Sequence, residues 1–195
     1  MKFLGFYDYT VSLTYISLFS AMNGMIAAGH GRFTAAVLCL MLCGICDAFD
    51  GTVARTKKNR TEDEKAFGIQ IDSLCDAFSF GIFPAYLSHC MGLDGTLGMT
   101  IAAVYALCAV IRLAFFNVQE AKRQQAESGV RETYRGLPVT SISIIYPLTY
   151  ALRFFLSAKV FRMLLHMVMA ATAFLFVLDF SVKKPHVEKL FSASK

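Results

Sequence analysis

The sequence contains few charged residues for its length. Asp, Glu, Lys and Arg together make up 17% of the 195 residues, proline occurs four times, and tryptophan is absent. Hydrophobic residues account for 56% of the chain, which is a high share for a soluble protein. This composition argues against a soluble domain and indicates a protein that lies largely within a lipid bilayer.

The six cysteines lack the partners that a zinc site requires. Cys43 and Cys46 form a C-x2-C pair, but no second pair and no nearby histidine completes a ligand set. The four histidines are scattered without metal-ligand spacing. We therefore interpret the cysteines as reduced packing residues and the histidines as structural or interfacial ones.

The chain also lacks an internal repeat, a low-complexity linker and a clear small-residue cleavage site after its first apolar run. That run, from about Val11 to Ala28, is long enough to span a bilayer, so we expect a retained helix rather than a signal peptide. The absence of a linker predicts a single membrane domain over residues 1–195.

Apolar segments of the length that a bilayer requires occur six times, and several of the connectors between them are short and contain glycine. The fold class that we predict is therefore an all-α integral membrane protein with six transmembrane helices. The expected spans are Tyr9–Ala28, Phe33–Arg55, Phe67–Cys90, Thr96–Asn117, Leu137–Phe155 and Val160–Phe180.

Lysine and arginine are distributed unevenly over the connecting segments. If the N-terminus is cytoplasmic, the inside segments carry Lys2, Arg55, Lys57, Lys58, Arg60, Lys65, Lys122, Arg123, Arg131, Arg135, Lys183, Lys184, Lys189 and Lys195, and the outside segments only Arg32, Arg153, Lys159 and Arg162. Because cytoplasmic loops are enriched in these residues, both termini are predicted to be cytoplasmic. The net charge of +5 then reflects contact with anionic lipid headgroups and not with nucleic acid.

Four aspartates lie inside the predicted spans, where a charge costs several kcal/mol and usually faces a partner, a cavity or an ion. Asp47 and Asp50 are three residues apart, and Asp72 and Asp76 are four apart, so each pair occupies one helix face. At about 1.5 Å per residue, Asp50 and Asp72 lie roughly 7 Å from the cytoplasmic helix ends, and Asp47 and Asp76 roughly 12–14 Å. The acids therefore form two layers, and Arg112 reaches the depth of the outer one.

Four carboxylates at one site call for cations. Hard oxygen ligands select Mg²⁺, Mn²⁺ or Ca²⁺, and two such ions between two carboxylate pairs suit phosphoryl chemistry. The sequence therefore predicts a site for two divalent cations, Mg²⁺ or Mn²⁺ with Ca²⁺ as a further occupant, near the cytoplasmic side of the membrane.

The same residues form a recognisable pattern, Asp47-x2-Asp50-Gly51-x2-Ala54-Arg55 followed by Gly68-x3-Asp72-x3-Asp76. It resembles the motif of the CDP-alcohol phosphotransferase family of integral membrane enzymes, with all the defining positions filled. The spacer between Arg55 and Gly68 is longer than is usual in that family. We expect the extra residues around Thr61–Glu64 to lengthen a cytoplasmic loop.

The resemblance implies a role for each motif residue. Asp47, Asp50, Asp72 and Asp76 would bind the two cations, and Asp76 would also be the general base that takes the proton of the acceptor hydroxyl. Small residues and one arginine would line the site for the CDP group: Gly51, Ala54, Arg55 and Gly68. The products would be CMP and a phosphodiester lipid, and the assembly a homodimer.

Three further stretches resemble the branch of this family that uses L-serine: Asp72-Ser73-Leu74-x-Asp76-x2-Ser79-Phe80-Gly81-x2-Pro84, Arg112-Leu113-Ala114-x-Phe116-Asn117-Val118 and Gly136-Leu137-Pro138. The resemblance implies transfer of a phosphatidyl group from CDP-diacylglycerol to L-serine. Arg112 is a candidate for binding the acceptor carboxylate or a substrate phosphate, and otherwise a structural partner of an aspartate. Weaker candidates for acceptor binding are Ser79, Asn117 and Arg135.

Two alternatives stay open at this point. A transferase of the same family could use glycerol phosphate or an inositol compound as the acceptor. A divalent-cation transporter could use the acidic cluster as its filter, although such a fold more readily shows interrupted helices in two repeats, and none is visible in the sequence.

Overall fold

The computed structural model describes residues 4–125 and 133–183, which are mainly helical and include one short pair of strands. In chain order the elements are the 3-10 turn η1 (Tyr9–Val11), α1 (Ser12–Gly29), α2 (Phe33–Thr56), α3 (Glu62–Asp76), the π-helical turn η2 (Ala77–Ile82), α4 (Phe83–Cys90), α5 (Gly95–Gln125), β1 (Thr133–Arg135), the 3-10 turn η3 (Val139–Ser141), α6 (Ile142–Ala151), the 3-10 turn η4 (Leu152–Phe154), α7 (Ala158–Val177) and β2 (Ser181–Lys183). Strands β1 and β2 are antiparallel, with Tyr134 opposite Val182.

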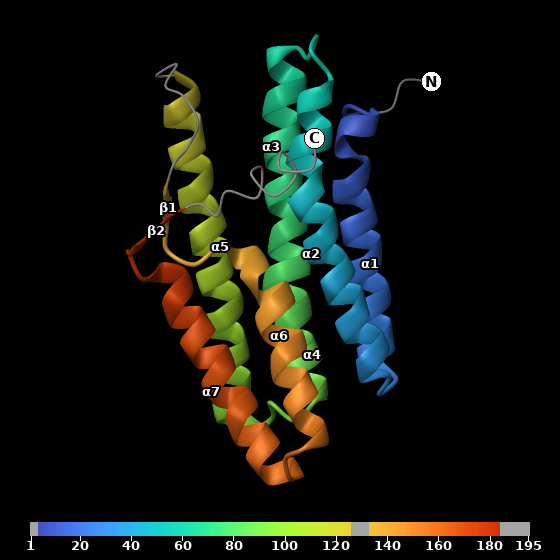
Figure 1. Cartoon of the computed structure of the whole chain (residues 1–195), viewed down its shortest axis with the longest axis vertical. Helices are drawn as coiled ribbons and strands as arrows, with labels where there is room; N and C mark the ends of the chain where they lie inside the picture. The colour runs from blue at the N-terminus through green and yellow to red at the C-terminus, as the bar shows by residue number, and fades with distance from the viewer. Residues whose placement is uncertain (1–3, 126–132, 184–195) are drawn as a thin grey trace, which may run out of the picture.

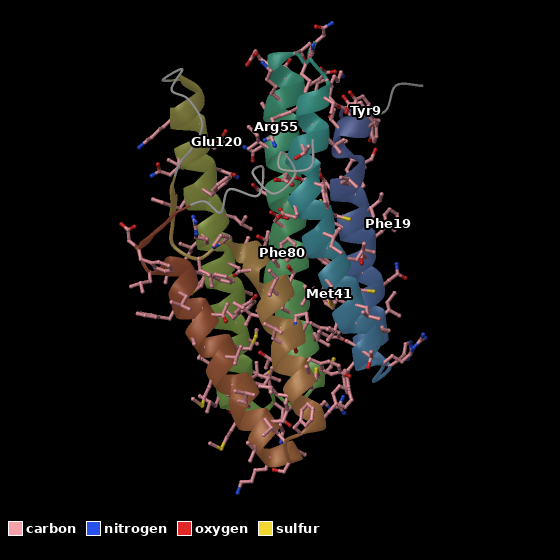
Figure 2. All side chains as sticks on the ribbon, in the orientation of Figure 1. Tyr9, Phe19, Met41, Arg55, Phe80 and Glu120 are labelled. Atoms are coloured by element: carbon pink, nitrogen blue, oxygen red, sulfur yellow. The ribbon has the colours of Figure 1, made fainter. Side chains whose placement is uncertain are left out.

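The helices lie roughly along one axis and form a bundle (Figure 1). α1 packs along α2 and α5 along α7, while α4 contacts α1 and α5. Large apolar side chains such as Phe80 are fully buried between these helices, whereas many others, such as Phe19 on α1 and Met41 on α2, are exposed on the outer surface (Figure 2). Such a broad apolar exterior is suited to lipid and not to water.

Five helices of the described residues are long and apolar enough to cross a membrane: Tyr9–Gly29, Phe33–Thr56, Glu62–Cys90, Gly95–Lys122 and Ala158–Val177. They correspond to five of the six predicted spans. The sixth, Leu137–Phe155, contains only the ten-residue helix α6 between two 3-10 turns. Pro138 holds an extended conformation directly before this segment and so delays its start, while α6 runs through Pro147 and is by itself shorter than a bilayer-spanning helix.

Helix α3 begins earlier than predicted, and the expected loop around Thr61–Glu64 was wrong. Thr61 caps the helix by accepting from the Glu64 amide, and the Glu64 side chain accepts from the Thr61 amide in return. This capping box satisfies two backbone donors that would otherwise be unpaired at the helix start. The extra residues of the spacer therefore form the first turn of α3 and bring its N-terminal end toward α1.

A chain of ion pairs connects that first turn to the start of α1. The Lys57 ammonium lies 2.7 Å from Oδ2 of Asp8 and 2.9 Å from Oε1 of Glu64. Asp8 in turn caps η1 through the Thr10 amide. The hydrogen bond from Lys57, with that from the Thr10 hydroxyl, lowers the pKa of the Asp8 carboxyl to about 2. We call this Asp8–Lys57–Glu64 chain the brace.

The long segment from Glu62 to Cys90 is not one regular helix. Pro84 has no amide hydrogen, so it cannot donate to the carbonyl of Phe80, four residues earlier. The hydroxyl of the fully buried Tyr105 on α5 donates to that carbonyl at 2.7 Å instead, and the intervening turn η2 widens to π geometry directly after Asp76. The start of α4 is thereby fixed against α5.

Replacing Lys57 with Met removes both ion pairs of the brace and is expected to lower the free energy of unfolding slightly, because solvent screens ion pairs at the protein surface. The Asp8 pKa is lowered from 3.8 to about 2 in the folded state, so the stabilisation is complete above pH 3.8 and is lost as the pH falls toward 2. Thermal unfolding in detergent, followed by circular dichroism at several pH values, measures the difference.

Lys58→Met is the matched control, because Lys58 is exposed in the same loop. An equal loss of stability in Lys58→Met, or a Lys57→Met effect that does not shrink between pH 4 and pH 2, would contradict this account of the brace.

Candidate active site

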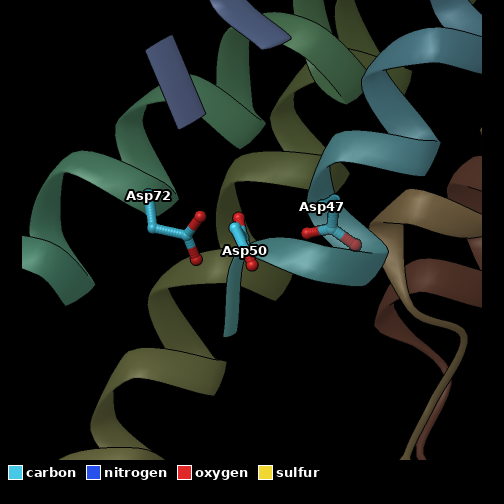
Figure 3. Close-up of side chains that lie close together, drawn as sticks. All are labelled: Asp47, Asp50 and Asp72. Atoms are coloured by element: carbon cyan, nitrogen blue, oxygen red, sulfur yellow. The ribbon is translucent and has the colours of Figure 1, made fainter. Parts of the chain in front are cut away.

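Three carboxylates from two helices meet within the bundle. Asp47 and Asp50 on α2 and Asp72 on α3 each offer an oxygen within 4.8 Å of the others (Figure 3). In the close-up Asp50 lies between the other two. The three-residue spacing on α2 sets two acids on the face that the acid of α3 approaches.

Asp76 lies one turn further along α3 and is 8% exposed. Its carboxyl group is within hydrogen-bonding reach of Asp47, as that of Asp72 is of Asp50. The pairs are therefore Asp50 with Asp72 and Asp47 with Asp76, which are the pairs that helix geometry assigned to the two layers.

The donor set fits a metal ion. The Oδ1 atom of Asp72 is buried and has no hydrogen-bond partner among residues 4–125 and 133–183, and none of the ion pairs in these ranges involves the four aspartates. A buried carboxylate oxygen without a donor costs free energy that a coordinated cation would offset. Carboxylate oxygens at this spacing could hold a hard divalent cation.

A cleft of about 150 Å³ opens beside Asp50 and Asp72. Helices α2 and α3 make few direct contacts with each other, whereas α1 packs against both. The cleft lies where these three helices meet. The motif residues Gly51, Ala54 and Gly68 line this cleft, where their small size leaves space for a ligand.

Arg55 lies beside the cleft and does not line it. Its Nη2 donates to Oγ1 of Thr52 at 3.3 Å, and its guanidinium lies next to Gly51 on the exposed end of α2 (Figure 2). The structure therefore brings together three of the four predicted CDP-contacting residues around the acids, and leaves Arg55 at the rim.

The predicted acceptor residues are not part of this cleft. The Nε of Arg112, which is 6% exposed on α5, donates to the Leu137 carbonyl at 3.2 Å. Ser79 is fully buried in η2 beside the hydroxyl of Ser17, and Asn117 accepts from the Ser73 hydroxyl at 2.8 Å. The backbone of Arg135 lies in β1, and its side chain is outside the described part of the structure.

Four polar residues that the sequence analysis did not single out as site residues also line the cleft: Thr10, Thr14, Arg60 and Lys65. The sequence held a signal for the two basic ones. Thr61-x-x-Glu64 is a capping-box pattern, and a helix capped there sets Arg60 directly before the N-cap and Lys65 on the first turn.

The profile of the family described as CDP-alcohol phosphatidyltransferase matches residues 10–178, nearly the whole of the helical bundle. The chain belongs to this family. With five helices of membrane-spanning length, this family member is an integral membrane protein. The matched range includes every motif residue around the cleft.

Named relatives are similar over much of the chain. It is 30% identical to the CDP-diacylglycerol–serine O-phosphatidyltransferase of Saccharomyces cerevisiae over 78% of this chain and 56% of that protein. It is 28% identical to the archaetidylserine synthase of Methanothermobacter thermautotrophicus over 72% of this chain and 58% of the relative. The Helicobacter pylori CDP-diacylglycerol–serine O-phosphatidyltransferase is 28% identical over 66% of this chain and 51% of that protein. The chain thus spans little more than half the length of these relatives.

Replacing Asp72 with Asn is expected to weaken Mn²⁺ binding by at least tenfold, because the amide supplies a neutral oxygen in place of a charged ligand. Electron paramagnetic resonance of free Mn²⁺ in a titration of the detergent-solubilised protein measures the affinity without any substrate. Asp63→Asn, which alters an exposed acid on the first turn of the same helix, is the control. Unchanged Mn²⁺ affinity in Asp72→Asn would exclude this carboxylate as a ligand.

Proposed function

We propose that this chain transfers a phosphatidyl group from CDP-diacylglycerol to L-serine and forms phosphatidylserine and CMP. The observation that carries the proposal is the cleft in which a family motif meets paired aspartates, one with a buried oxygen that has no hydrogen-bond partner in the described part of the chain. The relatives named for serine as the acceptor support the choice of that alcohol.

The four aspartates hold two divalent cations, Mg²⁺ or Mn²⁺, in this proposal. When bound, the cations neutralise the diphosphate of the donor and make CMP a better leaving group. Asp76, buried beside Asp47, accepts the proton of the serine hydroxyl. The serine oxygen then bonds to the phosphorus that carries the lipid as the bond from that phosphorus to the CMP oxygen breaks.

The small motif residues admit the cytidine diphosphate. Gly51, Ala54 and Gly68 line the cleft next to Asp50 and Asp72, so the phosphates can reach the acids from the side of the nucleotide. Arg55, at the rim, contacts the CDP group from outside the cleft. Arg112 binds the acceptor carboxylate, with Ser79, Asn117 and Arg135 as further acceptor contacts.

The positive-inside distribution supports a cytoplasmic site. The cleft lies at the end of the bundle where the α2–α3 connection carries Lys57, Lys58 and Arg60, the end that the charge bias assigns to the cytoplasm. Both termini are cytoplasmic in this arrangement, the chain crosses the membrane six times with α6 as the shortest segment, and two copies form a homodimer.

The first experiment supplies purified protein with CDP-diacylglycerol and Mn²⁺ or Mg²⁺, and follows CMP release and labelled lipid. We expect labelled lipid that forms only when serine is present and that no longer forms when EDTA removes the divalent cations. Asp76→Asn should lower kcat by about 10³-fold, because a positioned base contributes roughly 10²–10⁴, while Asp63→Asn should retain the wild-type rate.

Three outcomes would redirect the proposal. Product only with glycerol 3-phosphate or inositol phosphate would contradict serine and keep the reaction class. Product only with a CDP-activated archaetidyl lipid would contradict CDP-diacylglycerol as the donor. No CMP from any pair, together with divalent-cation flux in proteoliposomes, would support a transporter.

Arg112→Lys tests the acceptor site. If Arg112 binds the serine carboxylate through its planar guanidinium, the lysine variant should raise the KM for serine by about tenfold and leave the KM for CDP-diacylglycerol within twofold. Steady-state kinetics in mixed micelles give both values. Equal changes in the two KM values would instead indicate that Arg112 mainly holds the Leu137 carbonyl in place.

A further inference from the structure

Arg60 brings a guanidinium into the same cleft as the acids. It lines the cleft with Asp50 and Asp72, and it comes from the segment between Arg55 and Gly68 that the family motif does not specify. Its Nη2 donates to the Glu64 carbonyl at 2.9 Å, while its Nε is buried and has no hydrogen-bond partner within the described ranges. A buried N–H without an acceptor costs free energy until a ligand supplies one.

The backbone on both sides of Arg60 is held in place. Three residues before it, Lys57 is fixed by the brace, and directly after it Thr61 forms the N-cap of α3. The guanidinium is therefore positioned before any ligand arrives, so that binding costs less conformational entropy than ordering a free arginine would.

Gly68 makes this position possible. A Cβ atom at residue 68 would lie 2.5 Å from Nη2 of Arg60, which is closer than real side chains approach. The space that the glycine leaves open is thus filled by the guanidinium of Arg60. The motif glycine and an arginine outside the motif form one structural unit.

Arg60 does not neutralise the aspartates. The ion pairs of the described residues do not include it, so the cleft presents carboxylates and a guanidinium that are not matched to each other. Lys65, whose Nζ lies 2.7 Å from Glu62, adds a second cation to the lining. A ligand that satisfies both charge types must carry anionic oxygens for the arginine and be bridged to the acids by cations.

We propose that Arg60 is a substrate-binding residue that donates from its guanidinium to the diphosphate of the CDP-activated lipid. This inference rests on the proposed function and identifies the part of the donor that the residue recognises. A guanidinium pairs with phosphate oxygens through two parallel N–H groups, and the diphosphate is the group of the donor that carries charge. The small residues Gly51 and Ala54 in the same lining leave the room for it.

The test compares the Arg60→Gln and Arg60→Lys variants with a control, Lys58→Gln. Lys58 is an exposed residue of the same α2–α3 connection. Titration calorimetry with CDP, in the presence of Mg²⁺, requires no turnover. Arg60→Gln should weaken CDP binding by 10- to 100-fold, Arg60→Lys by less, and Lys58→Gln by under twofold. In turnover, Arg60→Gln should raise the KM for CDP-diacylglycerol and leave the KM for serine within twofold.

Gly68→Ala gives an independent check, since the added methyl group should displace the guanidinium and weaken CDP binding by a similar factor. The double variant Gly68→Ala/Arg60→Gln should then be no weaker than either single one. Circular dichroism melting of each variant shows whether the protein is folded.

The outcomes separate this inference from the proposed function. Wild-type protein that binds CDP in an Arg60-dependent manner but makes no lipid from serine would support the role of Arg60 and contradict the acceptor. Unchanged CDP affinity in folded Arg60→Gln, no CDP binding by the wild type, or a rise confined to the serine KM would overturn the role of Arg60.

Discussion

Four carboxyl groups between membrane-spanning helices cost free energy that their surroundings must offset. The helices that carry them, α2 and α3, pack little against each other, and a cleft lies beside the acids. Their relative position is instead set by α1, which contacts both, and by the brace at its N-terminal end. The acidic site therefore depends on a helix that contributes none of the acids.

Acidic and basic side chains lie at different depths at this end of the bundle. The acids lie deepest, with Asp76 almost fully buried, and the basic side chains of Arg60 and Lys65 line the same cleft nearer the first turn of α3. Both charge types come from short stretches, the acids from helix faces and the basic residues from a capped helix start. Such an arrangement favours a ligand that combines phosphate groups with metal ions over a simple cation or a simple anion.

Periodicity and length in the sequence were sufficient to predict five of the spans and the pairing of the aspartates, since both follow from helix geometry. The start of α3 was missed because apolar content was weighed more than the Thr61–Glu64 cap, and with it the place of Arg60 in the cleft. The contacts of Arg112 with the Leu137 carbonyl and of Ser79 with Ser17 could not be predicted, because they join residues far apart in the chain. The late start of the segment around α6 follows from Pro138, which was visible in the sequence.

The π-helical turn after Asp76 sets which face of α4 points into the bundle. It adds one residue to the helix, which rotates everything beyond it by about 100° relative to a regular helix. The buried face of α4, which includes Leu87 and the Ser88 hydroxyl that donates to Tyr146, depends on that rotation. If all the residues from Ala77 to Ile82 were held in regular α geometry, the acids would stay where they are and this face would turn toward lipid, whereas loss of one of these residues would let the turn close to α geometry with the face in place. A one-residue deletion should therefore be better tolerated in this turn than in the α-helical stretches on either side of it.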